Sequence, residues 1–210
     1  MVRRIRAQYA LCTVQDLADG IAWYDRAAIA ALGMAGFDML RAAGVIAALS
    51  PRCAWTTNLS WARAMLAAAI DGSSCPAVHT TTMRGQAWKI ANGHHALSVL
   101  GGPKVRSFFA NITGDHNAVT VDVWAARVAE GWKSPQPDAV SRVAKNRRKT
   151  GTGSIATTGK YKSDPSPTGK RYAMIANAYR AAALAESATS PISARDLQAA
   201  VWTSVRGSAL

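Results

Sequence analysis

Two segments decide the fold: Leu97-Ser-Val-Leu-Gly101-Gly102-Pro103-Lys104-Val-Arg106 and, after a polar loop, Val119-Thr-Val-Asp122-Val-Trp124-Ala-Ala-Arg127-Val128. They predict a helix, a glycine turn, a second helix, a loop, and a lone aspartate that opens a third helix. The glycines permit a tight turn that a Cβ would resist, and Pro103 presets the first turn of the helix that follows. The free N–H groups at such a helix start suit a phosphate of DNA.

These segments resemble the signature of the helix–hairpin–helix base-excision DNA glycosylases, the HhH-GPD superfamily. That family carries roughly L-x-G-x-G-x-K before its second hairpin helix and V-D-x-x-x-x-R-V after the loop. Lys104 falls on the family's lysine, Asp122 on its catalytic aspartate, and Arg127-Val128 on its Arg-Val pair. The spacing from Lys104 to Asp122 also suits the family.

A third match lies upstream, at the end of a predicted helix. The run Val45-Ile-Ala-Ala-Leu49-Ser50-Pro51-Arg52 is similar to the family's I-L-S-x-Q helix end, whose last residue wedges into the duplex; Arg52 stands at that position. The resemblance covers roughly residues 40–130. It implies an all-α fold with two helical lobes, in which residues 40–130 hold the hairpin and the aspartate, and residues 1–39 plus 131–210 form the second lobe.

The resemblance also implies a chemistry, in which a base is flipped out of the duplex and its N-glycosidic bond is cleaved. Asp122 would stabilise the positive charge that develops on the sugar; as a residue it also suits a plain helix N-cap, and the two roles are compatible. Lys104 would attack the sugar and form a Schiff base, which adds strand cleavage, the lyase reaction. The alternative for Lys104 is a phosphate contact.

The predicted DNA contacts are the hairpin residues, the wedge residue and a downstream basic run: Arg52, Gly101, Gly102, Lys104, Arg106, Arg147 and Arg148. Among the seven tryptophans, Trp55 and Trp124 neighbour Arg52 and Asp122, so each is a candidate for stacking on a flipped base. Most of the other tryptophans are expected in the core.

Cofactors are not expected, apart from a monovalent cation that hairpin carbonyls hold in this family. The three cysteines form no C-x-x-C pair, no quartet for an iron–sulfur cluster, and no metal spacing with the histidines. Isolated cysteines favour a reducing, cytoplasmic compartment, on the nucleoid or in a phage-infected host. The start of the chain lacks the apolar run of a signal peptide, and no apolar run is long enough to span a membrane.

The net charge of the chain predicts what kind of partner it binds. The formal net charge is +13 and the pI about 10.3, which favours a polyanion such as double-stranded DNA. Residues 133–169 form a basic, loop-rich segment whose charge run at 142–149 would grip phosphates. We expect a monomer.

Departures from the family pattern leave the function open between three hypotheses. Val-Trp follows Asp122 where Thr-His is common, arginine replaces the wedge glutamine, and the usual Pro-Gly start of the hairpin is missing. The first hypothesis is a DNA glycosylase. The second is a phage-type enzyme of the same fold that hypermodifies a 5-substituted thymine or uracil in DNA, and the third is a DNA-binding protein without catalysis.

Apolar residues at helical spacing and an abundance of alanine predict a chain of helices without strands. Most of the expected helices span residues 14–32, 37–49, 59–70, 94–100, 105–112, 122–130 and 170–185. Thr56-Thr57-Asn58 would cap the helix 59–70, and Thr80–Thr82 would cap a further helix that ends at about residue 91. The last helix starts after Ser193 and ends at about residue 205.

Overall fold

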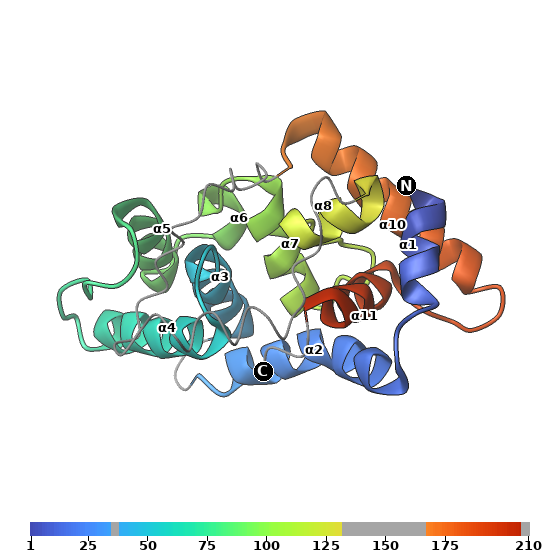
Figure 1. Ribbon diagram of the computed structural model, residues 1–210. Helices are drawn as coiled ribbons and strands as arrows, with labels where there is room; N and C mark the ends of the chain where they lie inside the picture. The colour runs from blue at the N-terminus through green and yellow to red at the C-terminus, as the bar shows by residue number, and fades with distance from the viewer. Residues whose placement is uncertain (35–37, 132–166, 207–210) are drawn as a thin grey trace, which may run out of the picture.

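A computed structural model describes residues 1–34, 38–131 and 167–206, and every regular element in these ranges is a helix (Figure 1). The prediction of an all-α chain is confirmed. The helices are α1 (Val2–Tyr9), α2 (Val14–Leu32), α3 (Met39–Leu49), α4 (Trp55–Ile70), α5 (Thr81–Ala91), α6 (Ala96–Val99), α7 (Pro103–Ile112), α8 (Val123–Glu130), α10 (Gly169–Glu186) and α11 (Ala194–Arg206).

Helix α1 and the start of α4 differ most from the sequence prediction. Periodicity does not predict α1, because Ile5 is its one buried side chain. The prediction that Thr56-Thr57-Asn58 caps the next helix is wrong, since α4 begins at Trp55 after Ala54 as N-cap. Asn58 instead lies buried in the first turn of α4 and donates a hydrogen bond to the carbonyl of Ile46 at 3.1 Å.

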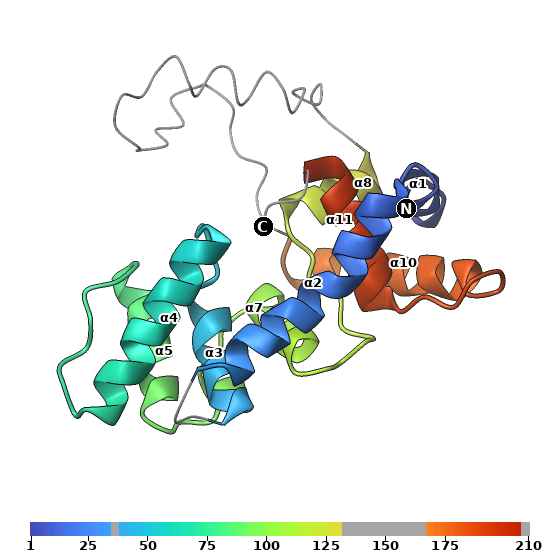
Figure 2. The ribbon, with the colours of Figure 1, turned by 90° about the horizontal axis from the view of Figure 1, so that it is seen from below.

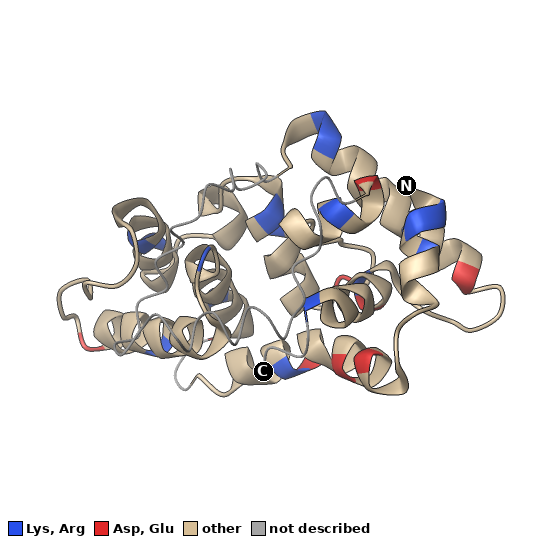
Figure 3. Cartoon of the chain, in the orientation of Figure 1, with Lys and Arg blue, Asp and Glu red and all other residues tan. Residues whose placement is uncertain are grey.

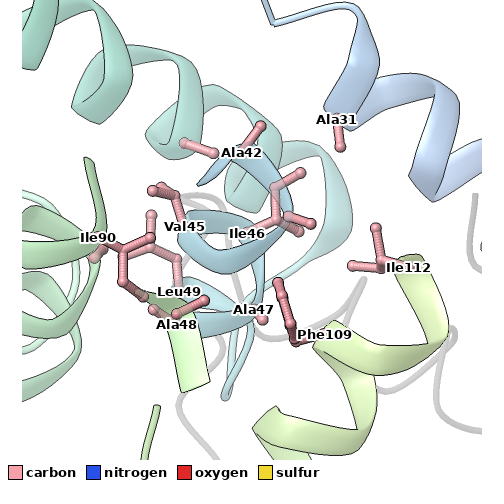
Figure 4. Packing of buried hydrophobic residues seen from close by; sticks show 14 of the residues in the cluster. Ala31, Ala42, Val45, Ile46, Ala47, Ala48, Leu49, Ile90, Phe109 and Ile112 are labelled. Carbon is pink, nitrogen blue, oxygen red and sulfur yellow. The ribbon is translucent and has the colours of Figure 1, made fainter. Parts of the chain in front are cut away.

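A first hydrophobic cluster surrounds α3, whose residues from Ala42 to Leu49 are all buried. Helices α2, α4, α5 and α7 pack against it, and Figure 4 shows the side chains of α3 between Ile90 of α5 and Phe109 and Ile112 of α7. The alanines of α3 let these neighbours approach closely, so one central helix supplies the core.

A second hydrophobic cluster joins the two ends of the chain to α8. It contains Ile5 of α1, the segment from Val119 to Val121, and the inner faces of α8, α10 and α11. The sequence-based lobe at 40–130 includes α8, whereas in the structure α8 packs in this second cluster.

Helix α2 connects the two clusters. Seen from below in Figure 2, it runs from the side of α1 and α11 to the end of α3. It approaches α11 very closely at Gly20, where an added Cβ would lie 2.4 Å from the Cα of Ala200. Glycine at this position therefore fixes how α11 lies across α2, and both helices contribute side chains to the cavity described below.

Candidate functional site

The predicted hairpin is present between α6 and α7. Gly102 has φ 73° and ψ 149°, a backbone conformation that favours glycine, and Pro103 is the first residue of α7. Arg106, which is exposed, braces the turn: its Nε donates to the carbonyl of Leu100 at 2.8 Å and its Nη2 to that of Leu97 at 2.9 Å. Gly101 and Gly102 remain exposed, so their backbone is open to a phosphate.

Asp122 is the N-cap of α8, and both of its carboxylate oxygens accept hydrogen bonds. The Ala125 N–H donates to Oδ1 at 2.9 Å, and Trp202 Nε1 on α11 donates to Oδ2 at 3.1 Å. The first bond is the cap that the sequence predicts. The second comes from a residue 80 positions away and holds the carboxylate in one orientation.

The segment that leads to Asp122 is fixed by Tyr172 of α10. Its hydroxyl donates to the Val119 carbonyl at 2.8 Å and accepts from the Val121 N–H at 3.0 Å, and it also lies 3.1 Å from Ser107 Oγ of α7. Burial raises the pKa of Tyr172, so the hydroxyl stays protonated at neutral pH. This single side chain ties the hairpin helix to the backbone before Asp122.

Lys104 and Asp122 line the same cavity, which lies where the two hydrophobic clusters meet. Its walls come from α2, the turn after α3, the start of α4, α7, residues 120–122 and α11, and its volume is about 210 Å³. Both side chains are half-buried. A lysine and an aspartate that come from helices of different clusters thus line one cavity.

Aromatic rings build much of the cavity wall, and Trp23 is at their centre. Its ring centroid lies 5.2 Å from that of Trp55, 5.7 Å from Phe108 and 6.2 Å from Trp202. Rings at such distances form a wall on which a planar ligand could stack. The guanidinium of Arg206 lies 4.7 Å from the Trp202 ring and adds a cation to the lining.

Two other groups in the lining stay protonated. Burial raises the pKa of the Cys53 thiol, so this side chain is a poor nucleophile at neutral pH. Burial also raises the pKa of Tyr24 to about 12, and its hydroxyl donates to Gln198 Oε1 at 3.3 Å. Lys104, which the sequence analysis selected, is the amine in the lining.

Arg52 lies beside the cavity in a strained turn. It is exposed with φ 58°, and its neighbours Ser50 and Cys53 line the cavity. His79, which itself has φ 57°, contacts the Pro51 carbonyl through Nε2 at 2.7 Å. A left-handed backbone conformation costs energy in residues other than glycine, so this turn needs support. The contact of His79 with the Pro51 carbonyl supplies it and keeps Arg52 at the rim of the cavity.

The structure does not bring Trp124 into the cavity. It follows Asp122 by two positions, so the helical turn carries its side chain away, and it packs against the second cluster with the Arg127 guanidinium 5.2 Å from its ring. Trp55 does line the cavity. Arg147, Arg148 and the rest of the segment 133–169 up to residue 166 lie outside the described residues.

The sequence analysis did not select three of the cavity residues, because they come from distant helices or belong to no motif. Trp23 and Trp202 were expected in the core with most other tryptophans, and Asn58 was assigned to a cap. The number of tryptophans was the one signal available, since the pairing of α2 with α11 is a tertiary feature.

Basic side chains occur on helices throughout the molecule. Figure 3 shows lysines and arginines on α7, α8, the start of α10 and α1, and also on α3, α4 and α5, whereas the N-terminal half of α2 carries aspartates. Some of these cations are paired, such as Arg171 with Glu130 at 2.6 Å. Exposed cations on α1 and at the start of α10 add to the positive surface.

Within the described ranges, no helix combines the length and the hydrophobicity that a bilayer crossing requires. The same residues contain no group of three or more His, Cys, Asp or Glu side chains that could hold a metal ion.

Comparison with known proteins gives a family without an assigned activity. Residues 1–148 match the model of a family of unknown function, DUF7178. No curated protein and no solved structure matches the chain.

Proposed function

We propose that this chain, which belongs to the family of unknown function DUF7178, is a DNA glycosylase of the helix–hairpin–helix type that works as a monomer on double-stranded DNA inside the cell. On this proposal the hairpin binds the backbone, a modified or damaged base flips into the cavity, and its N-glycosidic bond is cleaved. The two clusters would correspond to the two lobes of that fold, with the DNA between them.

The observation that carries the proposal is the meeting of Lys104 and Asp122 in one aromatic cavity. The two residues belong to different helices, and the sequence resemblance had assigned both to catalysis. The hairpin with exposed glycines on the same helix as Lys104 supports the proposal, because it offers N–H groups to a phosphate near the cavity.

Asp122 would act through its charge. As the base leaves, positive charge develops on the sugar, and a fixed carboxylate stabilises it without reorganisation. The bonds from Ala125 and Trp202 supply that fixed orientation. Each carboxylate oxygen still has a lone pair for the sugar or for a water molecule, since a carboxylate accepts about four hydrogen bonds in all.

Lys104 would act as the nucleophile. Its Nζ forms a bond to C1′ while the bond to the base breaks, and the base leaves with that electron pair and takes up a proton. Loss of an amine proton and opening of the sugar ring leave a Schiff base, which permits strand cleavage.

The test is base release from labelled duplexes that carry uracil, 5-hydroxymethyluracil, oxidised pyrimidines, 8-oxoguanine, alkylated purines or an abasic site, with borohydride to trap a Schiff base. We expect release of a free base from at least one duplex, a loss of about 100-fold or more in Asp122→Asn, and no trapped adduct in Lys104→Ala. Lys89→Ala, which removes an exposed lysine outside the cavity, is the matched control.

Two outcomes would reject the proposal. Salt-sensitive DNA binding without release from any duplex would leave a DNA-binding protein. A mass increase of the base without its loss would identify a modification enzyme.

A further inference from the structure

The lining of the cavity is exposed to solvent at two of its described residues, Ala54 and Arg206. The other lining residues are buried or half-buried, and the buried ones include Tyr24, Phe108 and Gln198. The cavity therefore opens to solvent at the turn after α3, which contains Ala54, and at the end of α11, which contains Arg206. A ligand that enters the cavity has to pass these two segments.

Each of the two segments carries an exposed arginine. Arg52 lies two positions before Ala54, and Arg206 is the last residue of α11. Most arginines in the described ranges donate to a carboxylate or a carbonyl or pair with a carboxylate. Arg52 and Arg206 have no such partner in the part of the chain that the structure describes. Their N–H donors are thus available to a ligand at the opening.

The lining also holds more positive than negative charge. Asp122 is the one acidic side chain among the described lining residues, and it already accepts from Ala125 and Trp202, whereas Lys104 and Arg206 both contribute a cation. The Arg206 guanidinium lies 4.7 Å from the centroid of the Trp202 ring, a cation–π contact that restrains it beside the cavity. An anion that approaches this opening is attracted by a guanidinium whose position is partly fixed.

We infer that Arg206 binds a phosphate of the strand whose nucleotide enters the cavity, and that Arg52 binds the strand at the same opening. A guanidinium suits this role because it donates two parallel hydrogen bonds to phosphate oxygens. The ligand is then an internal nucleotide of a strand, with its base in the aromatic lining and its phosphate outside. This inference rests on the proposed function and adds a residue of α11, in the second cluster, to the predicted DNA contacts.

The first test measures binding to a duplex with a tetrahydrofuran abasic-site analogue, which has no base to release and does not depend on which base the cavity takes. We expect Arg206→Gln to bind about tenfold more weakly and to lower the slope of log Kd against log salt concentration by about one, as for the loss of one phosphate contact. Arg206→Lys keeps the charge and should restore the slope. Arg63→Gln, which removes an exposed arginine of α4 outside the cavity, is the matched control and should change neither value.

The second test identifies the phosphate. One phosphate at a time is replaced by an uncharged methylphosphonate, and wild type and Arg206→Gln are compared on each duplex. At one of the phosphates next to the abasic analogue, the replacement should weaken wild-type binding about tenfold and should not weaken Arg206→Gln further, because the contact is already absent. At distant phosphates the two proteins should lose affinity equally.

Three results would overturn the inference: wild-type affinity and salt dependence in Arg206→Gln, a loss in Arg206→Gln that is the same with every methylphosphonate, or displacement of the duplex by inorganic phosphate but not by chloride at equal ionic strength. The last result would assign Arg206 to free phosphate. Base release is scored separately, because its absence from every duplex rejects the proposed function whatever Arg206 binds. Base release without an Arg206 contact overturns the inference alone.

Discussion

Two groups of residues in the cavity lining differ in how completely their polar atoms are paired. In the first group, which we call the aspartate wall (Thr120, Asp122, Gln198 and Trp202), Asp122 accepts from Ala125 and Trp202, and Tyr172 holds the backbone before it. In the second group, the tryptophan wall (Trp23, Trp55 and Asn58), one donor and one acceptor are buried without partners.

This difference indicates a division of labour. A group that must stabilise charge works best when its orientation is fixed before the ligand arrives, and the aspartate wall meets that requirement. The tryptophan wall supplies ring surface instead, since its two unpaired polar atoms are fully buried.

Among the residues that support Asp122, the largest effect is expected from Trp202→Phe. The ring and its packing against Trp23 remain, but Asp122 loses the bond at Oδ2. Since a hydrogen bond to a charged group contributes about 1.5–3 kcal/mol, single-turnover base release should slow about 10- to 100-fold. Affinity for uncleavable DNA should change little. A variant that cleaves at the wild-type rate would contradict a positioning role for Trp202.

The next effect concerns stability. Tyr172→Phe leaves the buried Val121 N–H without its acceptor and releases the Val119 carbonyl, so urea unfolding should show a loss of about 1–3 kcal/mol. Tyr179→Phe is the comparison, since the Tyr179 hydroxyl makes one bond, to the Ala125 carbonyl at 3.2 Å. An equal or larger loss in Tyr179→Phe would argue against a special role for the Tyr172 network.

A smaller effect is expected at the hairpin. Arg106→Lys replaces a guanidinium that reaches two carbonyls with a single ammonium, and thermal unfolding should show a loss of about 0.5–1.5 kcal/mol in the free energy of unfolding.

Because Arg106 already occupies the carbonyls of Leu97 and Leu100, exchange of K⁺ for Na⁺ at constant ionic strength should leave wild-type DNA affinity unchanged. A clear preference for one cation would show that other carbonyls of the hairpin hold it.

The last effect is a loss of stability in alkali, where the Tyr24 hydroxyl titrates. The folded-state pKa of Tyr24 is raised from 10.0 to about 12, so the folded protein holds the phenolic proton more tightly than the unfolded chain. This contribution to stability is complete below pH 10 and is lost as the pH rises toward about 12. Tyr24→Phe should flatten the fall of unfolding free energy over that window, and an unchanged slope would contradict the assignment.

The sequence predicted the parts of the molecule that depend on local order. The all-helical fold, most helix bounds, the glycine turn and the cap at Asp122 follow from periodicity, propensity and capping, and the structure confirms them. It also brings Lys104, Trp55 and Asp122, which the sequence analysis selected from motifs and neighbours, to one cavity. Their roles remain predictions.

What the sequence could not predict depends on packing between distant helices. Trp202 reaches Asp122 because α11 crosses α2 at Gly20, and no local pattern reports that crossing. The sequence suggests Asn58 as a helix cap, yet its amide donates a hydrogen bond to the Ile46 carbonyl of α3. Arg106 looks like a DNA contact, yet two of its nitrogens bind hairpin carbonyls.

The central claim is that the cavity with Lys104 and Asp122 receives a flipped base, and indole N–H resonances test it most directly. Trp23→Phe and Trp88→Phe assign the signal of a tryptophan that lines the cavity and that of one outside it. We add a duplex in which the base found by the release assay carries an uncleavable 2′-fluoro sugar. We predict that the Trp23 signal shifts, because a base in the cavity lies close to its ring, while the Trp88 signal does not change. A Trp23 signal that does not change although the duplex is bound would contradict the account.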